Sequence, residues 1–287
     1  MRIKRKLVKL LWAAIIVSLP FLKIGGESAI RFDIPLLTLY FFGTDIRIHE
    51  FFIVLIAAIF ICLLFILITL LFGRMWCGWL CPQTVLVDFT AFTDKFKKGF
   101  LYRLLSLFLI LLISAVVGAN LIWYFVSPYE FFGHLLKWEI SQTIWRFWIV
   151  LTAIIFLNLV FIRRKFCVTV CPYSKLQSAM YDNKTLVIAF DPSKSDDCIK
   201  CMSCVKKCPV EIDIRQGLHQ ACIYCGECID ACKDIMKREG KDGDSLINYF
   251  FGLPGEKGRI VRQGVVMVGF VTLAFLIFLI YLLLKET

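Results

Sequence analysis

Charged residues are scarce in this sequence. They make up 19% of the 287 residues, whereas hydrophobic residues make up 59%. An ordinary soluble domain has more charge and less apolar content, so the composition indicates a membrane protein. The formal net charge is +11. Because the basic residues flank apolar segments, this excess indicates orientation in a membrane and argues against nucleic-acid binding.

Two further absences narrow the class of protein. The 13 cysteines show no even pairing pattern of the kind found in small secreted scaffolds, which argues against a disulfide framework. The N-terminus has a basic start and an apolar run, but no clear small-residue cleavage site follows. We therefore expect this segment to be retained as a first membrane span and not removed as a signal peptide.

Five apolar segments are candidates for crossing a bilayer, which takes about 20 residues. We expect the spans at about residues 7–22, 51–72, 104–124, 144–162 and 265–284. The first contains Lys9, whose side chain we expect to reach toward the lipid headgroups. Basic residues gather before the first span, between the second and third, after the fourth and before the fifth. The positive-inside rule then places the N-terminus in the cytoplasm and the C-terminus outside.

A short amphipathic pattern follows the second span. Val85, Phe89, Phe92 and Phe96 recur at helical spacing. This spacing predicts a helix that lies on the cytoplasmic membrane surface or packs on the spans, and the sequence favours neither.

Eight cysteines form two runs of identical spacing in the polar stretch after the fourth span. The first run is C-x2-C-x2-C-x3-C-P and begins at Cys198, and the second repeats the spacing from Cys222 without the proline. This spacing is typical of two-cluster bacterial ferredoxins, in which the fourth cysteine of each run ligates the other cluster. Zinc sites use pairs of C-x2-C with a longer gap. The pattern therefore predicts two 4Fe–4S clusters.

The ferredoxin rule also predicts which cysteines share a cluster. The first set is Cys198, Cys201, Cys204 and Cys232, and the second set is Cys208, Cys222, Cys225 and Cys228. We expect Ile199, Ile223 and Ile229 to shield the sulfurs from water. The predicted fold is a mainly α-helical membrane protein with an inserted α+β ferredoxin module. Its predicted parts are a four-span membrane domain over residues 1–172, the cytoplasmic module over 173–258, and a fifth span with a short C-terminus over 259–287.

Four other cysteines lie at the cytoplasmic ends of two spans. Arg74-Met-Trp-Cys77-x3-Cys81-Pro82 resembles Arg164-Lys-Phe-Cys167-x3-Cys171-Pro172. This internal repeat suggests one structural unit used twice, with two corners that face each other. A spacing of four places both sulfurs on one face of a helix. Alternatively, each proline begins a new helix and Cys81 and Cys171 cap it.

The chemistry of these CxxxCP cysteines is left open by the sequence. Soft thiolates favour Cu(I) over harder ions, so we treat Cys77, Cys81, Cys167 and Cys171 as candidate copper or redox residues. A redox-active dithiol, a zinc site, a further iron–sulfur cluster and four inert buried thiols are the alternatives. The thirteenth cysteine, Cys62, lies alone in the middle of a span, where packing is the simplest role.

Taken together, the motifs resemble the cytochrome c oxidase accessory protein family of the CcoG, FixG and RdxA type. The resemblance rests on GRMWCGWLCPQTV (73–85), CVTVCPYSKLQSAMYD (167–182), EIDIRQGL (211–218) between the two cysteine runs, and Phe32-Asp33-Ile34-Pro35 in the first outer loop. It implies an inner-membrane protein with cytoplasmic 4Fe–4S clusters. It also implies an oxidoreductase of the cupric reductase type, which reduces Cu(II) to Cu(I) at the CxxxCP cysteines for assembly of a cbb-type oxidase.

The implied partners are the lipid bilayer, a cytoplasmic electron donor, and cbb-type oxidase subunits or a copper transporter or chaperone. Whether the chain forms a homo-oligomer is left open. Family members typically carry an immunoglobulin-like domain after the last span, and this sequence ends at Thr287, which puts contacts made through that domain in doubt. Two other functions compete: a quinol dehydrogenase component of a nitrate-reductase-like system, and a non-catalytic oxidase assembly factor.

Overall fold

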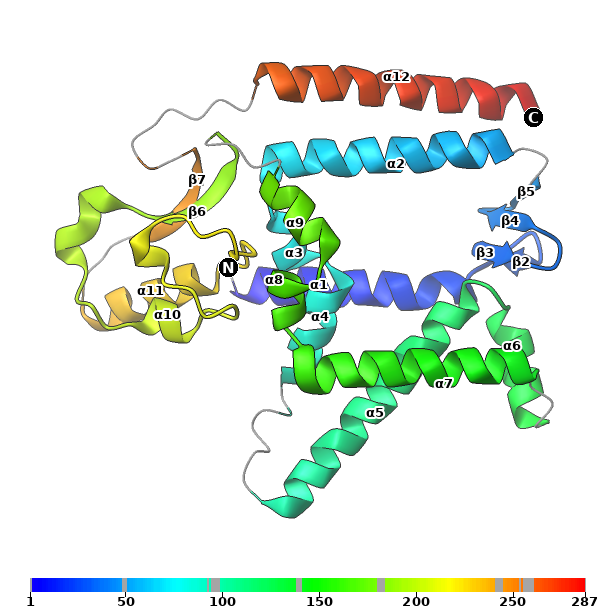
Figure 1. The fold of residues 1–287 in the computed structure, drawn as a ribbon, viewed down its shortest axis with the longest axis horizontal. Coiled ribbons are helices and arrows are strands. Elements are labelled where there is room, and N and C mark those ends of the chain that lie inside the picture. The colour runs from blue at the N-terminus through cyan, green and yellow to red at the C-terminus, as the bar shows by residue number, and fades with distance from the viewer. Residues whose placement is uncertain are drawn as a thin grey trace. The chain divides into compact units, whose positions relative to one another are not determined.

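The fold was analysed in a computed structural model of the chain (Figure 1). The structure describes residues 2–47, 51–91, 93, 99–137, 141–179, 184–240, 245–252, 254 and 261–286. These residues fall into two compact units. The first comprises residues 1–9, 52–84 and 164–287, and the second comprises residues 10–51 and 85–163.

Among the described residues, four helices are long and apolar enough to cross a membrane, and they match four of the predicted spans. They cover Phe52–Phe72, Phe100–Trp123, Gln142–Ile162 and Gln263–Leu284. The corresponding elements are α2 (Phe51–Phe72), α5 (Phe100–Trp123), α7 (Gln142–Leu157) with a π-helical turn at Asn158–Ile162, and α12 (Gln263–Glu286). Helix α5 begins about four residues earlier than predicted, because helical structure continues past the apolar segment through Arg103.

The first predicted span corresponds to α1 (Arg2–Ser18), which continues through a 3-10 turn at Leu19–Phe21. With 17 residues, α1 is shorter than the four helices above, so a total of five spans stays a prediction. Lys9 is only 6% exposed. The expectation that its side chain reaches outward was therefore wrong, because the protein itself buries it.

In the first unit, α2 and α12 lie side by side (Figure 1). The ring centroids of Phe52 and Phe278 are 6.4 Å apart, and Gly269 faces the side chain of Leu67. Since these contacts pair the start of α2 with the end of α12, the two helices are antiparallel. Both are apolar over their whole circumference, as expected for helices that contact lipid.

The cysteine-rich segment of the first unit is bracketed by a two-stranded antiparallel sheet. Strands β6 (Leu186–Phe190) and β7 (Ile247–Phe251) pair with Leu186 opposite Phe251 and Phe190 opposite Ile247. Between them lie 3-10 helices at Pro192–Asp197 and Ile214–Gln216, α10 (Ser203–Lys206) and α11 (Glu227–Arg238). Val187, Ile188 and Ile247 are at most 1% exposed and form the core with the cysteines. This is the predicted α+β module.

Two pairs of short helices belong to the first unit, except that the last helix of the first pair continues past the boundary of the unit at residue 84. Helices α3 (Met75–Trp79) and α4 (Pro82–Phe89) follow α2, and α8 (Lys165–Thr169) and α9 (Pro172–Ala179) follow the π-helical turn. Each pair has lengths of five and eight residues. The predicted repeat is therefore present in the backbone. The last three residues of the quoted second motif, 180–182, lie outside the described residues.

The second unit contains β-structure that the sequence did not suggest. Strands β1 (Lys23–Ile24) and β2 (Glu27–Ser28) form one hairpin, and β3 (Ile30–Asp33), β4 (Thr38–Phe41) and β5 (Thr44–Arg47) form a three-stranded antiparallel sheet. Helices α5 and α7 cross at Gly118, where an added Cβ would lie 3.1 Å from the Thr152 hydroxyl. Small residues permit such close crossings in membranes. Helix α6 (Pro128–Leu136) lies between them in sequence.

The predicted amphipathic helix is present in part as α4. Val87 is 2% exposed and packs with Ile110 of α5 and Leu159, whereas Phe89 is 43% exposed. The described part of this helix therefore packs on the spans. Phe92 and Phe96 lie outside the described residues.

Candidate functional site

The two cysteine loops have the same backbone course. Lys200 and Met202 in the first loop have φ of 53° and 60°, and Tyr224 and Gly226 at the equivalent positions in the second have φ of 52° and 73°. Left-handed residues before and after the middle cysteine make each loop turn tightly. The structure thus extends the repeat from the cysteine spacing to the main chain.

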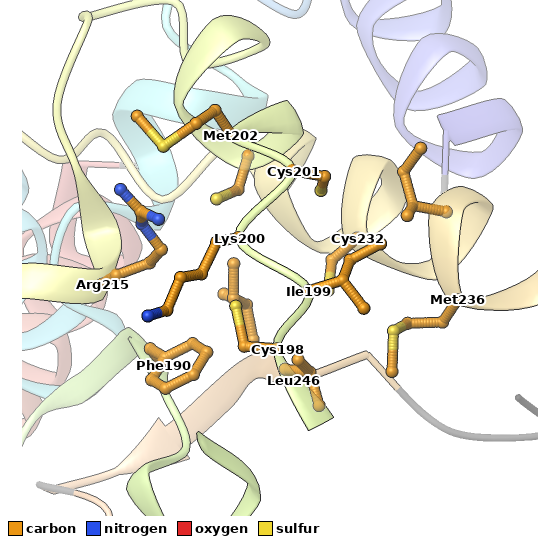
Figure 2. Close-up of a pocket in the computed structure, with 13 residues that line it drawn as sticks. Phe190, Cys198, Ile199, Lys200, Cys201, Met202, Arg215, Cys232, Met236 and Leu246 are labelled. Atoms are coloured by element: carbon orange, nitrogen blue, oxygen red, sulfur yellow. The ribbon is translucent and has the colours of Figure 1, made fainter. Parts of the chain in front are cut away.

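The predicted first set of cysteines lines one cavity (Figure 2). The cavity has an empty volume of about 410 Å³. The cysteines that line it are Cys198, Cys201, Cys204 and Cys232. Phe190, Ile199, Met202, Met236 and Leu246 supply much of the apolar wall around them.

The predicted second set lines another cavity, of about 330 Å³. It comprises Cys208, Cys222, Cys225 and Cys228, and Cys204 of the first set touches the same cavity. The surrounding side chains include Ile188, Ile212, Ile214 and Ile223. Each cavity therefore brings together the four cysteines that the ferredoxin rule groups.

The donor sets suit a polynuclear group. Among the described residues, no three His, Cys, Asp or Glu side chains are close enough to hold a single metal ion. A 4Fe–4S cubane is larger than an ion and holds its four thiolates farther apart, so sulfurs around a small apolar cavity fit it. Burial raises the pKa of Cys222 to about 12 and that of Cys225 to about 11. These thiols lose their protons when iron binds.

The two cavities differ in their access to water. Cys222, Cys225 and Cys228 are each 9% exposed, whereas Cys201 is exposed at the surface. The predicted shielding holds for Ile223 and Ile229, which are 3% and 6% exposed. Ile199 is 46% exposed, so it covers its cavity only in part.

The two CxxxCP corners have matching hydrogen bonds. The Cys77 amide donates to the Arg74 carbonyl at 3.0 Å, and the Cys167 amide donates to the Arg164 carbonyl at 3.2 Å. The Cys81 and Cys171 amides each donate, at 2.9 Å, to the carbonyl five residues before them. Helices α4 and α9 then begin at the prolines, so the capping alternative is the one observed.

Cys167 of the second CxxxCP corner packs against the buried cluster that contains Cys77 of the first. Burial, with a smaller contribution from the other three corner cysteines, raises the pKa of Cys77 to about 12. The pKa of Cys167 rises to about 11 for the same reason, with Cys81 and Cys171 contributing. The structure thus joins the corners into one site, which we call the four-thiol site.

A buried polar shell surrounds Cys77. Its thiol donates to the Gln177 side-chain oxygen at 3.3 Å, and Gln177 is 2% exposed. The Thr84 hydroxyl donates to the Cys77 carbonyl at 2.6 Å. Tyr173 packs on the same cluster, and its hydroxyl is 3.0 Å from that of Thr69.

The first corner also touches the ferredoxin module. Cys77, Ile223 and Cys225 form one buried cluster. A Cβ added to Gly78 would lie 2.8 Å from both the Cα and the amide nitrogen of Cys225. The backbone of the corner is therefore in direct contact with the loop that carries the second cysteine set.

Two buried arginines connect this region. In the sequence, Arg5 belongs to the basic N-terminus and Arg74 to the repeated CxxxCP motif, and neither pattern predicts these contacts. Arg5 is 2% exposed; it donates to the Cys225 carbonyl at 2.6 Å and pairs with Glu227 at 2.5 Å and Asp230 at 3.2 Å. Arg74 donates to the carbonyls of Gln220 and Ser174. No sequence signal separates these arginines from the exposed ones beside them.

Family models match most of this region. A model described as a 4Fe-4S dicluster domain matches residues 162–196 and 192–251. A second, described as a 4Fe-4S binding domain, matches residues 54–99, which hold the first CxxxCP corner. The matches support iron–sulfur clusters as cofactors.

Curated relatives are similar over most of the chain. Protein RdxA of Cereibacter sphaeroides is 33% identical over 251 residues, which cover 78% of this chain and 53% of the relative. Nitrogen fixation protein FixG of Rhizobium meliloti is 28% identical, with 78% and 49% covered. Ferredoxin-type protein NapH of Haemophilus influenzae is 29% identical, with 56% and 60% covered. The chain spans about half the length of the first two relatives. No solved structure matches it.

Proposed function

The chain belongs to the RdxA and FixG family of membrane iron–sulfur proteins, and from this premise we propose that it reduces Cu(II) to Cu(I) at the four-thiol site. The product Cu(I) would serve assembly of a cbb-type cytochrome c oxidase. The general class, a membrane-bound iron–sulfur electron-transfer protein, follows from the relatives and the family models. Copper as the substrate is the added claim.

The observation that carries the proposal is the contact between the first corner and the second cysteine loop. Gly78 lies against the backbone of Cys225, and the Cys77 side chain shares a buried cluster with Cys225. A one-electron donor site and an acceptor site in direct contact require no further protein element between them. Ligands of the second set are Cys208, Cys222, Cys225 and Cys228 in this proposal, and those of the first are Cys198, Cys201, Cys204 and Cys232.

The proposed reaction at the four-thiol site is a one-electron reduction. The clusters, when bound, supply single electrons. Cu(II) gains one electron, and each thiol that binds copper loses one proton. Thiolate sulfur is a soft ligand that favours Cu(I), so binding at Cys77, Cys81, Cys167 and Cys171 assists the reduction. Two thiolates suffice for Cu(I), and therefore the lack of a three-ligand site for a single ion among the described residues is compatible with this role.

The residues around Cys77 have supporting roles. The Gln177 oxygen accepts the thiol hydrogen, and burial of both groups keeps water away. Once copper replaces that hydrogen, the Gln177 amide can present its N–H to the sulfur instead. Thr84 fixes the backbone of the corner through the Cys77 carbonyl. Such supporting partners orient ligands and tune a metal site.

The proposal is tested by replacing all four corner cysteines with serine. We expect the variant to keep about eight irons per chain and to lose Cu(II) reduction by a low-potential viologen, measured with a Cu(I)-specific chelator. Cys62→Ser is the matched control, because Cys62 lies alone in α2. Wild-type rates in the four-cysteine variant would contradict the proposal. Oxidation of quinol by the protein would support the quinol dehydrogenase alternative.

A further inference from the structure

The two cysteine sets are not equally accessible to a protein in water. The second set is enclosed, with three of its cysteines 9% exposed and Ile223 at 3%. The first set opens outward: Cys201 is exposed, and Ile199 and Met202, which line the same cavity, are 46% and 38% exposed. In the described part of the chain, a soluble partner can therefore approach the first set more closely than the second.

The opening of the first cavity has an apolar centre, and exposed lysines lie close to it along the chain. Ile199 and Met202 form the centre, and Lys200 lies between them in sequence and is exposed. Lys206 and Lys207 are also exposed, and their amides donate to the carbonyls of Met202 and Ser203 at 3.0 Å, so they lie within one helical turn. We call these five residues, Ile199, Lys200, Met202, Lys206 and Lys207, the Cys201 face.

Other charged residues belong to the same part of the module. Arg215 lines the cavity but is paired with Asp213 at 2.7 Å. Asp196 and Asp197 precede Cys198 on the 3-10 helix and are exposed. Along the chain, the acidic pair Asp196 and Asp197 precedes the face, and the face itself carries Lys200, Lys206 and Lys207.

We propose that the Cys201 face docks an acidic protein that carries one electron at a time, of the flavodoxin or small ferredoxin class. The inference rests on the proposed function, because it supplies the electron donor which that function needs. The carrier loses one electron and this protein gains it, and no bond forms or breaks. Redox partners of this kind meet over small interfaces and rely on opposite charge to find one another.

The place of the apolar centre favours a protein over the other candidate, an anionic lipid surface. Lysines would also attract lipid headgroups. However, the apolar centre consists of residues that line the cavity of the first cysteine set, so whatever covers it comes into contact with the cluster ligands. Contact with the cluster ligands adds nothing to the binding of a lipid headgroup, whereas an electron carrier requires this contact to transfer its electron.

The test measures binding of an acidic flavodoxin to the full chain in nanodiscs of zwitterionic lipid. The variant is K200E/K206E/K207E, and a milder one replaces the same lysines with glutamine. The matched control is K233E/K237E/R238E, which makes the same charge change at exposed positions of α11. We expect binding at least about tenfold weaker for the Glu variant at low ionic strength and an intermediate loss for the Gln variant. The difference should vanish at about 1 M salt.

Equal affinities of the wild type and the Cys201-face variants, or an equal loss in the control, would overturn the proposal. So would a loss of binding to vesicles of anionic lipid without any loss of flavodoxin binding. Reduced methyl viologen, a small donor that needs no docking face, should support the same Cu(II) reduction in all these proteins. If viologen fails to drive Cu(II) reduction even in the wild type, the proposed function fails, and the flavodoxin affinities still decide the docking face.

Discussion

At the residue scale, the most consequential position is a glycine. Gly78 has no side chain where the first corner meets the second cysteine loop, and the nearest atoms are main-chain atoms of Ile223 and Cys225. Main-chain atoms cannot rotate aside as a flexible side chain can. The close approach of the two segments therefore depends on the absence of one methyl group.

We expect Gly78→Ala to separate the corner from the loop. Overpacking of this kind costs about 1–3 kcal/mol of folding free energy, and displacement of reacting groups by about 1 Å can slow a reaction by two orders of magnitude. Cu(II) reduction by viologen should fall by at least about tenfold, while iron content stays at the wild-type value. Gly264→Ala is the control, because a Cβ there meets no atom within 4 Å. An unchanged rate in Gly78→Ala would show that the contact does not matter.

At the residue scale, the sequence predicts a site best where the chemistry of that site constrains the spacing of its residues along the chain. Each cavity brings together one predicted group of four cysteines, and Cys204 of the first group also lines the second cavity. Which cysteines share a cluster stays a prediction. The roles of Arg5 and Arg74 were not predictable. Their contacts join segments 220 and 146 residues apart along the chain, and no local pattern records such a distance.

At the element scale, the first turn of α1 is held by the ferredoxin module. Arg5 occupies a buried site between the Cys225 carbonyl and two carboxylates, Glu227 and Asp230, at the start of α11. Those side chains are 33% and 11% exposed. Acidic residues in the first turn of a helix are stabilised by its dipole, and Arg5 balances their charge beside the second cysteine set.

Arg5→Met should detach this turn and destabilise the module. Breaking a buried ion pair costs about 3–5 kcal/mol, and we expect the lower end because Glu227 is one-third exposed. The midpoint of chemical unfolding, followed by the loss of iron–sulfur absorbance, should shift to lower denaturant. The exposed neighbour Lys6 provides the matched control as Lys6→Met. Equal midpoints for the two variants would mean that the ion pair contributes nothing.

Prediction of elements succeeded for long apolar helices and failed for short strands. Four spans were located within a few residues, since a bilayer imposes length and composition on any helix that crosses it. Strands β1 to β5, of two to four residues each, were missed. Hairpins this short carry too few residues for an alternating pattern, and their pairing depends on neighbours such as Tyr124, whose carbonyl accepts from the Phe32 amide.

At the scale of the whole molecule, the contacts of Arg5 bear on the number of spans. The N-terminal turn touches the ferredoxin module, so both lie on the same side of a membrane. A chain that returns to its starting side crosses an even number of times. Since α2, α5 and α7 supply three crossings before the module, we expect α1 to supply the fourth, and α12 to be the fifth.

This topology predicts opposite sides for the module and the C-terminus. Alkaline phosphatase fused after Leu284 should be active, because the enzyme requires export, whereas a fusion at Gly240 in the module should be inactive. Expression of both fusions is checked by immunoblot. Activity of the Gly240 fusion, or inactivity of the Leu284 fusion, would refute the five-span arrangement.

The repeated corners differ at one equivalent position. Gly78 follows Cys77 in the first corner, whereas Val168 follows Cys167 in the second and is 40% exposed. Each corner carries two cysteines at the same spacing. The first corner has no side chain at this position, and its backbone meets the Cys225 loop there. The two copies of the repeat are therefore not interchangeable, because the contact with the Cys225 loop is made where the side chain is missing.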